Sequence, residues 1–565
     1  MRMALYACSS LEPQSSELYS DFNPSFHMRH GRFGVLLALA TLPPSLLLSQ
    51  EHGHAHQVGK LGRVVFPVSC TPAAQKKFEH AMAVLHSFWW EEGDRAFGDV
   101  LAADSSCAMA HWGMAVNAWG NPFAGGPSTP AGLVRGTEAA ARASALPVKT
   151  ERERGFIAAV DALYRDADSK PNAVRLKAYA DTLSRLYRAH PKDVEVAIYY
   201  ALGQIATAPK TDTTFAQQRR AIAILEPLYA RHPDHPGLAH YVIHATDSPV
   251  LAKLGLNAAR RYAQIAPAAP HAQHMPSHIF VRLGLWNETI ASNWKSYRAG
   301  ADYAKAMNQP GAPEELHALD YAVYGYLQHG QDSAARAAVA EGRKVNTNTK
   351  SLVAGYNRTA MAARVPLERG DWEAAAEFPE PTDSVPPIAT ALAKFTRAIG
   401  SARSGRAEAA VSEIKALDSI TTALEEKGEP YWSRVVGIKR DVAESWVRFA
   451  AGDTVGALAL AKAAADSEEV TDKHPVTPAE LLPATELQGD MLLLAGRYAE
   501  ARAAYKATLA RERNRARSLY GMARAAELAG DRKGATESYR AFLKLMAKAD
   551  GDRPELATAK KVVRR

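Results

Sequence analysis

Sustained alternation of apolar and polar residues, the pattern of a half-buried strand, is rare along this chain. Alanine is very frequent, and it is the residue that most favours a helix. Both features bias the sequence towards helix rather than sheet. We therefore expect an almost all-α protein.

A glycine followed five residues later by an alanine recurs through the C-terminal half of the chain. The pairs are Gly330/Ala335, Gly370/Ala375, Gly405/Ala410, Gly452/Ala457, Gly496/Ala501 and Gly530/Ala535. We expect each glycine to end the first helix of a hairpin in a left-handed conformation, and the small alanine to let the second helix pack closely. Each hairpin then leaves an apolar face that only its neighbours can cover. The repeat predicts a right-handed α-solenoid of helical hairpins with a concave groove.

The last two copies define the length of the repeat. The residues Gly489, Gly496, Ala501 and Tyr505 recur at one constant offset as Ala523, Gly530, Ala535 and Tyr539. The offset is about 34 residues, which is the period of the tetratricopeptide repeat (TPR). The chain resembles the TPR superfamily, strongly in residues 485–545 and more loosely from about residue 75.

Two other stretches extend the resemblance. Residues Phe78–Phe123 look like a first repeat in which Gly93 replaces the usual alanine. Together with His274–Phe280 they are similar to a group of exported bacterial TPR proteins of unassigned function. The resemblance implies architecture rather than activity. Insertions at 120–150 and 468–483 depart from the TPR pattern, and we expect them to be loops or extra helices that fold over the solenoid.

The N-terminal stretch has the order of a secretory signal. Arg29 and Arg32 precede an apolar run, Val35–Leu42, and the polar stretch before them indicates that translation starts at Met28. A membrane anchor is the alternative, but two prolines interrupt the run and it is shorter than the roughly 20 apolar residues that a bilayer needs. We expect an exported protein, periplasmic or extracellular, without a stable membrane span after processing.

These features divide the chain into segments of different character. We expect a leader at 1–49, a His-containing segment at 50–71, an N-terminal TPR-like region at 72–300, a central divergent TPR-like region at 301–480, a C-terminal TPR pair at 481–550 and a basic tail at 551–565. The three histidines of the second segment, His52, His54 and His56, fit a solvated tail better than a metal-scavenging tract.

Charge and motifs exclude several classes of function. The 565 residues include 68 Lys+Arg and 60 Asp+Glu, a net charge of +8 with both signs interspersed. A nucleic-acid groove is therefore not indicated, and we expect no nucleic-acid partner. The chain also lacks the phosphate-binding loops of nucleotide-binding proteins, the G-x-S-x-G elbow of hydrolases and the H-E-x-x-H zinc motif.

Histidine placement is the strongest chemical signal. His240 and His244 share one helix face, and His274 and His278 repeat that spacing one TPR period later. Counting back from the repeat glycines places further candidates on the same concave faces: His271, His317, Asp320 and Tyr324. Because neutral imidazole is a common ligand of transition metals, the pattern predicts a Zn, Cu or Fe site. The alternative is hydrogen-bonded packing between helices, with Pro276 separating the second pair.

The remaining candidates are structural or contact residues. We expect Arg282 to contact a ligand near the groove, and Trp286, Asn293 and Trp294 to lie beside it. His86 lies in an apolar helix and is expected to be a core histidine. Cys70 and Cys107 are the cysteines left after processing, and we expect a disulfide between them, with two buried free thiols as the alternative.

Taken together, the sequence indicates an exported TPR scaffold that binds a protein, peptide or polymer partner in its concave groove, with a transition metal at the histidines as an open possibility. The alternative is a metal-dependent enzyme, a hydrolase or an oxidoreductase, that uses Asp247, Glu315 or Asp320 as a base. The sequence favours the binding protein over the enzyme and leaves the oligomeric state open.

Overall fold

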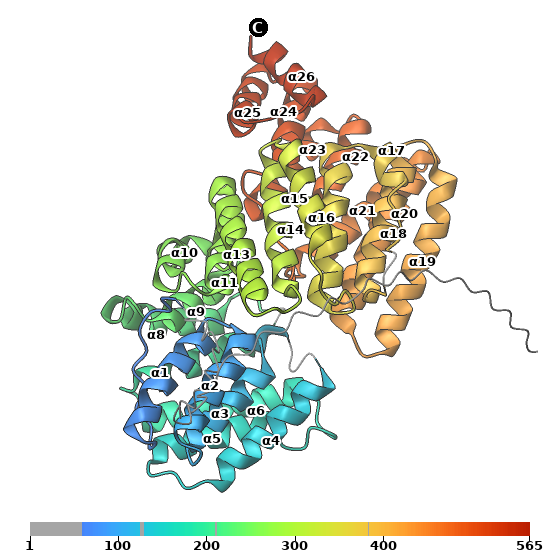
Figure 1. Cartoon of the computed structure of the whole chain (residues 1–565). Helices are drawn as coiled ribbons and strands as arrows, with labels where there is room; N and C mark the ends of the chain where they lie inside the picture. Colours follow the sequence, from blue (N-terminus) through green and yellow to red (C-terminus); the bar gives the residue numbers. More distant parts are fainter. Residues whose placement is uncertain (1–58, 125–128, 210–211, 382–383, 565) are drawn as a thin grey trace, which may run out of the picture. The chain divides into compact units, whose positions relative to one another are not determined.

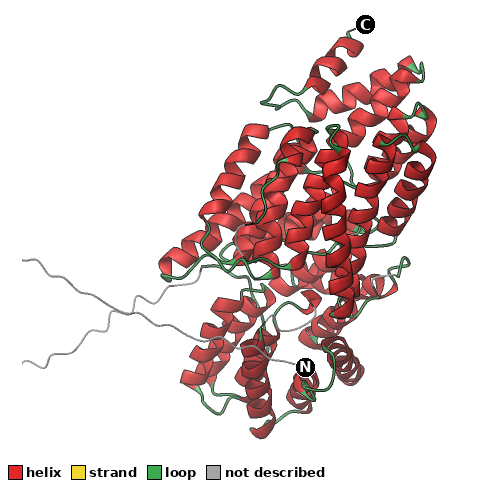
Figure 2. Ribbon diagram, turned by 90° about the vertical axis from the view of Figure 1, so that its right-hand side faces the viewer, coloured by secondary structure: helices red, strands yellow, loops and turns green. Residues whose placement is uncertain are grey.

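The computed structural model describes residues 59–124, 129–209, 212–381 and 384–564. All regular secondary structure in these residues is helical (Figures 1 and 2). The described helices belong to one compact unit, His56–Arg565. The predicted leader at 1–49 and the three histidines that follow it lie outside the described residues. Among the helices that are described, none is long and apolar enough to cross a membrane.

The N-terminal helices form successive pairs, with each helix packed on the next. The pairs are α1 (Pro72–His86) with α2 (Trp90–Ala103), α3 (Ala108–Trp119) with α4 (Pro130–Ala145), α5 (Glu151–Tyr164) with α6 (Asn172–Ala189), α7 (Val194–Ala206) with α8 (Ala216–Arg231), and α9 (Pro236–Thr246) with α10 (Ala252–Ile265). A short 3-10 helix, η1 (Pro122–Ala124), follows α3. The predicted insertion at 120–150 thus contributes η1 and α4, and α4 packs on α3.

The central and C-terminal helices continue the same arrangement. They are α11 (Pro270–His274) and α12 (Pro276–Leu283) with α13 (Trp286–Ala306), α14 (Pro313–Gln328) with α15 (Asp332–Lys344), α16 (Leu352–Arg369) with α17 (Trp372–Ala376), α18 (Pro387–Arg403) with α19 (Ala407–Glu426), α20 (Pro430–Ala450) with α21 (Thr454–Glu469), α22 (Ala484–Leu494) with α23 (Tyr498–Arg511), and α24 (Ala516–Leu528) with α25 (Arg532–Leu545). First helices of neighbouring pairs also pack together, from α14 through α16, α18, α20 and α22 to α24 (Figure 1). The predicted α-solenoid of TPR-like hairpins is confirmed.

The repeat glycines and alanines do what their spacing predicts. All six glycines have left-handed backbone conformations, with φ between 65° at Gly370 and 87° at Gly452. An L-residue with a Cβ is strained there, whereas glycine is not. The six paired alanines are buried, with Ala535 the most exposed at 1%. Glycine therefore ends the first helix, and alanine lets the second helix approach it.

The helix starts also follow local sequence. Thr71 caps α1, where its hydroxyl accepts a hydrogen bond from the amide of Ala74, and Pro72 occupies the first turn. Proline suits that position because its missing N–H would have no partner inside the helix. The predicted basic tail contains a last helix, α26 (Pro554–Val563), which begins with proline in the same way and packs on α25.

The N-terminal end is tied down by packing and by a disulfide. Phe66 is fully buried and contacts the rings of Phe78 and Phe156 at centroid distances of 5.3 and 5.2 Å. Cys70 and Cys107 are bonded, with their Cα atoms 5.1 Å apart, so the segment before α1 is joined to the start of α3.

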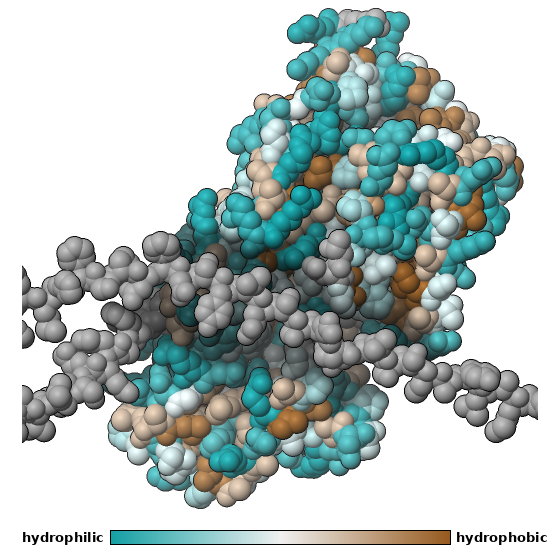
Figure 3. Space-filling model, turned by 45° about the vertical axis from the view of Figure 1, so that its right-hand side comes forward, coloured by the Kyte–Doolittle hydropathy of each residue, from teal (hydrophilic) through white to brown (hydrophobic). Residues whose placement is uncertain are grey.

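On the face in Figure 3, hydrophobic residues occur in small separate groups among hydrophilic ones.

The segment 470–483 folds back over the first helices of the central repeats. Its backbone carbonyls accept hydrogen bonds from His317, at Val476, and from Tyr321, at Thr477, with distances of 3.0 and 3.1 Å. The sequence predicted that this insertion would cover the solenoid, and the structure confirms it. The inner face of α14 and α16 is therefore in contact with the chain itself.

Candidate metal centre

Six histidines from four helices converge at the junction between the N-terminal and central repeats. They form two groups, and within each group the ring nitrogens that could bind a metal lie within 4.8 Å of one another. The first triad is His240 and His244 of α9 with His271 of α11, and the second triad is His274 of α11 and His278 of α12 with His317 of α14. The structure thus brings together all four histidines of the repeated spacing and two of the predicted groove residues.

The proline between His274 and His278 does not separate them. Although α11 ends at His274 and α12 begins at Pro276, Met275 keeps right-handed helical angles, with φ −52° and ψ −35°. The two side chains consequently stay on one face, and their Nε2 atoms are 3.0 Å apart. The alternative in which Pro276 parts the pair is wrong.

The Nδ1 atoms of the second triad all face hydrogen-bond acceptors. His278 Nδ1 lies 2.8 Å from Asp247 Oδ2, and His317 Nδ1 lies 3.0 Å from the carbonyl of Val476. His274 Nδ1 lies 2.6 Å from the amide oxygen of Asn293. A carbonyl or a carboxylate oxygen only accepts, so in the neutral rings of His274 and His278 Nδ1 carries the hydrogen and Nε2 presents a lone pair.

Two of these acceptors are fixed by their own contacts. The Asn293 amide nitrogen donates to the carbonyl of Thr289 at 2.7 Å, which turns its oxygen towards the histidine. Burial alone would raise the pKa of Asp247, but Lys473 and Arg282 hold it well below its ordinary value, so the carboxylate is ionised. Its Oδ1 accepts from Arg282 Nε at 2.9 Å.

The Nε2 lone pairs of His274 and His278 therefore face each other at 3.0 Å with no hydrogen between them. A cation held between the two nitrogens would relieve the repulsion of these lone pairs, and a proton is disfavoured there. Burial and the neighbouring imidazoles lower the pKa of His274, burial lowers the pKa of His278 despite Asp247, and burial lowers the pKa of His317 to about 3. At neutral pH the triad consists of neutral imidazoles, which is the form that binds metal.

The first triad is built in the same way around His240. Its Nδ1 donates to the carbonyl of His86 at 2.7 Å, so its Nε2 also presents a lone pair. That Nε2 lies 3.0 Å from Nε2 of His244 and 3.2 Å from Nε2 of His271. Burial lowers the pKa of both His240 and His271. Three ring nitrogens therefore meet at one point here as well.

Aromatic rings form an apolar wall beside the first triad. The ring of Phe88 lies 4.5 Å from that of His240 and stacks on His271 at 5.5 Å, while Phe123 stacks on His244 at 4.2 Å. Phe88 has a left-handed backbone with φ 50°, which is uncommon for a bulky residue. The strained turn directs the ring to the triad and places the His86 carbonyl beside His240.

The site is buried on one side and accessible on the other. His240, His274 and His278 are at most 3% exposed. The third member of the second triad and two members of the first are partly exposed: His317, His244 and His271. Each triad thus combines buried histidines with partly exposed ones.

Arg282 and the carboxylates considered as bases have structural partners. Arg282 is buried and bridges Asp247 to Asp472, where its Nη2 lies 3.1 Å from Oδ1. It contacts the second triad through Asp247, and it also lines a small cavity of about 50 Å³. Glu315 accepts a hydrogen bond from the amide of Ala312 at the start of α14. Asp247 and Glu315 are therefore held by the fold itself.

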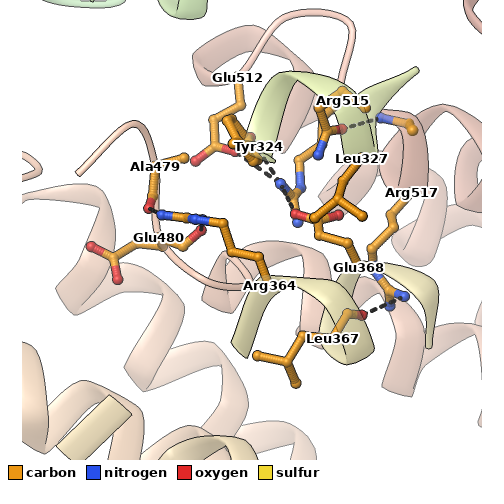
Figure 4. Close-up of polar contacts among 12 residues, drawn as sticks. Tyr324, Leu327, Arg364, Leu367, Glu368, Ala479, Glu480, Glu512, Arg515 and Arg517 are labelled. Carbon is orange, nitrogen blue, oxygen red and sulfur yellow. Dashed lines mark hydrogen bonds and ion pairs between the residues drawn. The ribbon is translucent and has the colours of Figure 1, made fainter. Parts of the chain in front are cut away.

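Asp320 and Tyr324 do not line an open groove, contrary to the sequence-based expectation. Both are fully buried. Asp320 pairs with Arg364 at 2.8 Å. Arg364 also donates to the carbonyls of Ala479 and Glu480 at 2.8 and 3.1 Å (Figure 4). The segment 470–483 covers this face, which local spacing could not show.

Tyr324 lies at the centre of a second buried network, between α14 and the turn before α24. Its hydroxyl donates to Glu512 at 3.0 Å and accepts from Arg515 Nη1 at 2.9 Å (Figure 4). The neighbouring Trp286, expected near the groove, is also buried and donates from Nε1 to the carbonyl of Asn514 at 2.9 Å. These residues hold the C-terminal repeats against the central ones.

A third group of ligand-type residues has a structural role. His86, Glu195 and His235 are buried, and Glu195 contacts Nε2 of both histidines at 3.0 and 2.9 Å. The remaining nitrogen of His86 lies 3.0 Å from the hydroxyl of Tyr241, and that of His235 accepts from the amide of Leu238. Every ring nitrogen has a protein partner, so this group is a closed hydrogen-bond network, and His86 is the core residue that was expected.

Sequence reasoning missed the groups that orient and enclose the ligands. The carbonyls of His86 and Val476 have no sequence signal, because any residue provides a carbonyl and both lie far along the chain from the histidines they orient. Phe88 and Phe123 appeared as ordinary apolar residues. Asn293 was expected near the groove, but its part in fixing His274 was not.

Known proteins provide no family for this chain. No protein-family model matches the chain, and no curated protein sequence does. Among solved structures, the chain is similar to one described as the structure of Naa15/Naa10 bound to HypK-THB, at 9% identity over 87% of this chain and 91% of that chain. The TM-score is 0.24. The fold class therefore rests on the helical hairpins themselves, and the site on its own geometry.

Proposed function

We propose that this protein is a transition-metal-binding protein built on a TPR-like solenoid, with the six histidines of the two triads as ligands. The observation that carries the proposal is the second triad, where two buried Nε2 lone pairs face each other at 3.0 Å while both Nδ1 atoms face acceptors. With the hydrogens on Nδ1, a cation shared by the two Nε2 atoms would make that contact favourable. Histidine ligands of metals characteristically donate their other ring N–H to a carboxylate or a carbonyl in this way.

The proposed ions are those that imidazole suits, which include Zn, Cu and Fe. The test is elemental analysis of full-length protein purified without an affinity tag, compared with the variant His244→Ala/His278→Ala, which removes one ligand from each triad. We expect stoichiometric metal in the wild-type protein and its loss in the variant, with helical circular dichroism retained. His190→Ala is the matched control, because this histidine lies at the end of α6, outside both triads.

Three results would contradict metal binding at the two triads. If the histidines only pack, the double variant leaves buried groups unsatisfied and lowers the melting temperature to the same extent with and without chelator. Bound metal that is unchanged in a folded double variant would rule out the triads as the site. Wild-type protein that neither contains metal nor takes it up would refute the proposal as a whole.

We also propose that the solenoid binds a protein, peptide or polymer partner, because helical-repeat proteins present extended surfaces for binding. The face of α14 and α16 is covered by the segment 470–483, so the partner would contact another surface. Cross-linking in the producing cells is expected to give a discrete adduct with a second molecule. Recovery of uncross-linked protein alone would contradict this part.

Export is part of the same proposal. The bonded Cys70 and Cys107 fit an oxidising compartment, where disulfides persist. Cell fractionation with N-terminal sequencing is the test, and we expect periplasmic or secreted protein that lacks residues up to about Ser49. Cytosolic protein with an intact N-terminus would contradict it.

The metal-dependent enzyme remains the second candidate function. The partly exposed His244, His271 and His317 favour it, because a substrate needs access to the ions. The three carboxylates considered as bases do not favour it, since each is already engaged in the fold. Hydrolase or oxidase activity that depends on added metal and disappears in the double variant would establish the enzyme.

A further inference from the structure

The two triads are separate sets of ligands that lie side by side. Helix α11 contributes one histidine to each, because His271 and His274 are one turn apart. Within each triad the candidate ligand atoms all lie within 4.8 Å of one another, whereas the six atoms taken together do not. Two ligands at about 2.1 Å from one ion can be no more than about 4.2 Å from each other. Each triad comes close to this limit, whereas the two triads together exceed it.

The donor set has no negative charge. All six ligands are neutral imidazoles, and no carboxylate or thiolate belongs to either triad. The one carboxylate bonded to a ligand, Asp247, is already paired with Arg282, and Lys473 Nζ lies 3.8 Å from it. Two divalent ions would therefore place four positive charges in a largely buried site, where the nearby Arg282 and Lys473 are already balanced by Asp247 and Asp472. Repulsion between such charges grows as their product, so two monovalent ions repel each other one quarter as strongly.

We infer that the two triads bind two copper(I) ions, one in each triad, as a paired centre. Copper(I) is the monovalent ion among the transition metals that imidazole binds, and three nitrogen donors satisfy it. Three histidines can also hold a zinc ion that keeps water as its fourth ligand, so zinc(II) is the competitor, and it is disfavoured here by its charge rather than by the number of ligands. The apolar rings of Phe88 and Phe123 favour the ion of lower charge further. The inference rests on the proposed metal-binding function and adds the number and the identity of the ions.

The test is anaerobic titration of metal-free, full-length protein with copper(I) in competition with a copper(I) chelator, and separately with zinc(II). We expect two equivalents of copper(I) per chain. His278→Ala/His317→Ala should lose one equivalent, His244→Ala/His271→Ala the other, and the combined variant both. Zinc(II) should bind at least about tenfold more weakly, which corresponds to about 1.4 kcal/mol.

The outcomes separate this inference from the proposed function. One equivalent of metal in the wild-type protein overturns the paired centre and leaves the metal-binding function standing. Two equivalents of zinc(II) bound as tightly as copper(I) overturn the choice of copper. No uptake of either metal refutes the proposed function itself. Because a variant could fail to fold, X-ray absorption of the copper-loaded wild-type protein is the second measurement: three nitrogen neighbours per copper support the inference, and two or four overturn it.

Discussion

Replacing Arg364 by methionine should release the segment 470–483 from the central repeats. The guanidinium is fully buried, pairs with Asp320 at 2.8 Å, and donates to the hydroxyl of Thr477 and the carbonyl of Ala479, both at 2.8 Å. Methionine fills much of the same volume but donates nothing. The Asp320 carboxylate would then be buried without its partner, and acceptors of the segment would lose their donor.

The magnitude follows from the burial. Breaking a fully buried ion pair by removing one partner costs about 3–5 kcal/mol, because the remaining charge stays desolvated. Part of that loss is avoidable, since burial raises the pKa of Asp320 and the carboxyl can take up a proton. The double variant Asp320→Leu/Arg364→Met should therefore recover most of the stability, although the carbonyls of the segment remain unpaired.

Hydrogen exchange measures this effect locally, which suits a chain too long for simple two-state unfolding. In Arg364→Met, we expect amides of residues 471–483 to exchange at least about tenfold faster, while those of α3 and α5 stay unchanged. The exposed Arg336 provides the matched control, and Arg336→Met should have no effect. Unchanged exchange in 471–483 at wild-type stability would refute the reasoning, because the segment would then be held by something else.

Three further perturbations test other parts of the structure. Asn293→Ala should weaken the second triad's metal affinity about 10–100-fold with the helical content retained, and Asn293→Asp, which keeps an acceptor oxygen, should restore most of it in a competition titration. Cys70→Ser/Cys107→Ser should lower the free energy of unfolding by about 3–4 kcal/mol for a separation of 37 residues, and thermal unfolding unchanged from wild type would contradict this. Burial and the nearby Glu480 raise the pKa of Glu468 from 4.5 to about 8, so the folded protein keeps a proton that the unfolded chain releases, and its stability falls as pH rises through that range. Glu468→Gln should therefore raise the melting temperature at pH 9 and change it little at pH 4, and the reverse order would contradict the assignment.

Much of the fold is determined by local sequence. A glycine at the end of a helix and an alanine five residues later act within one hairpin, through backbone sterics and side-chain size, and Gly452 and Ala457 show both effects. The solenoid follows because each hairpin must bury its apolar face on the next. The same repeat period placed His240 and His274 in register, so the convergence of the two histidine pairs was predictable.

The tertiary structure decided how the histidines divide and what orients them. The histidines form two triads because α11 contributes one histidine to each. The carbonyls of His86 and Val476, which come from remote parts of the chain, orient the rings of His240 and His317. Asp320 and Tyr324 have the spacing of groove residues, but the segment 470–483 and the turn before α24 cover them. The spacing of residues along a helix determines which of them share a face. What covers that face depends on contacts between segments far apart in the sequence, and a local sequence pattern carries no information about those contacts.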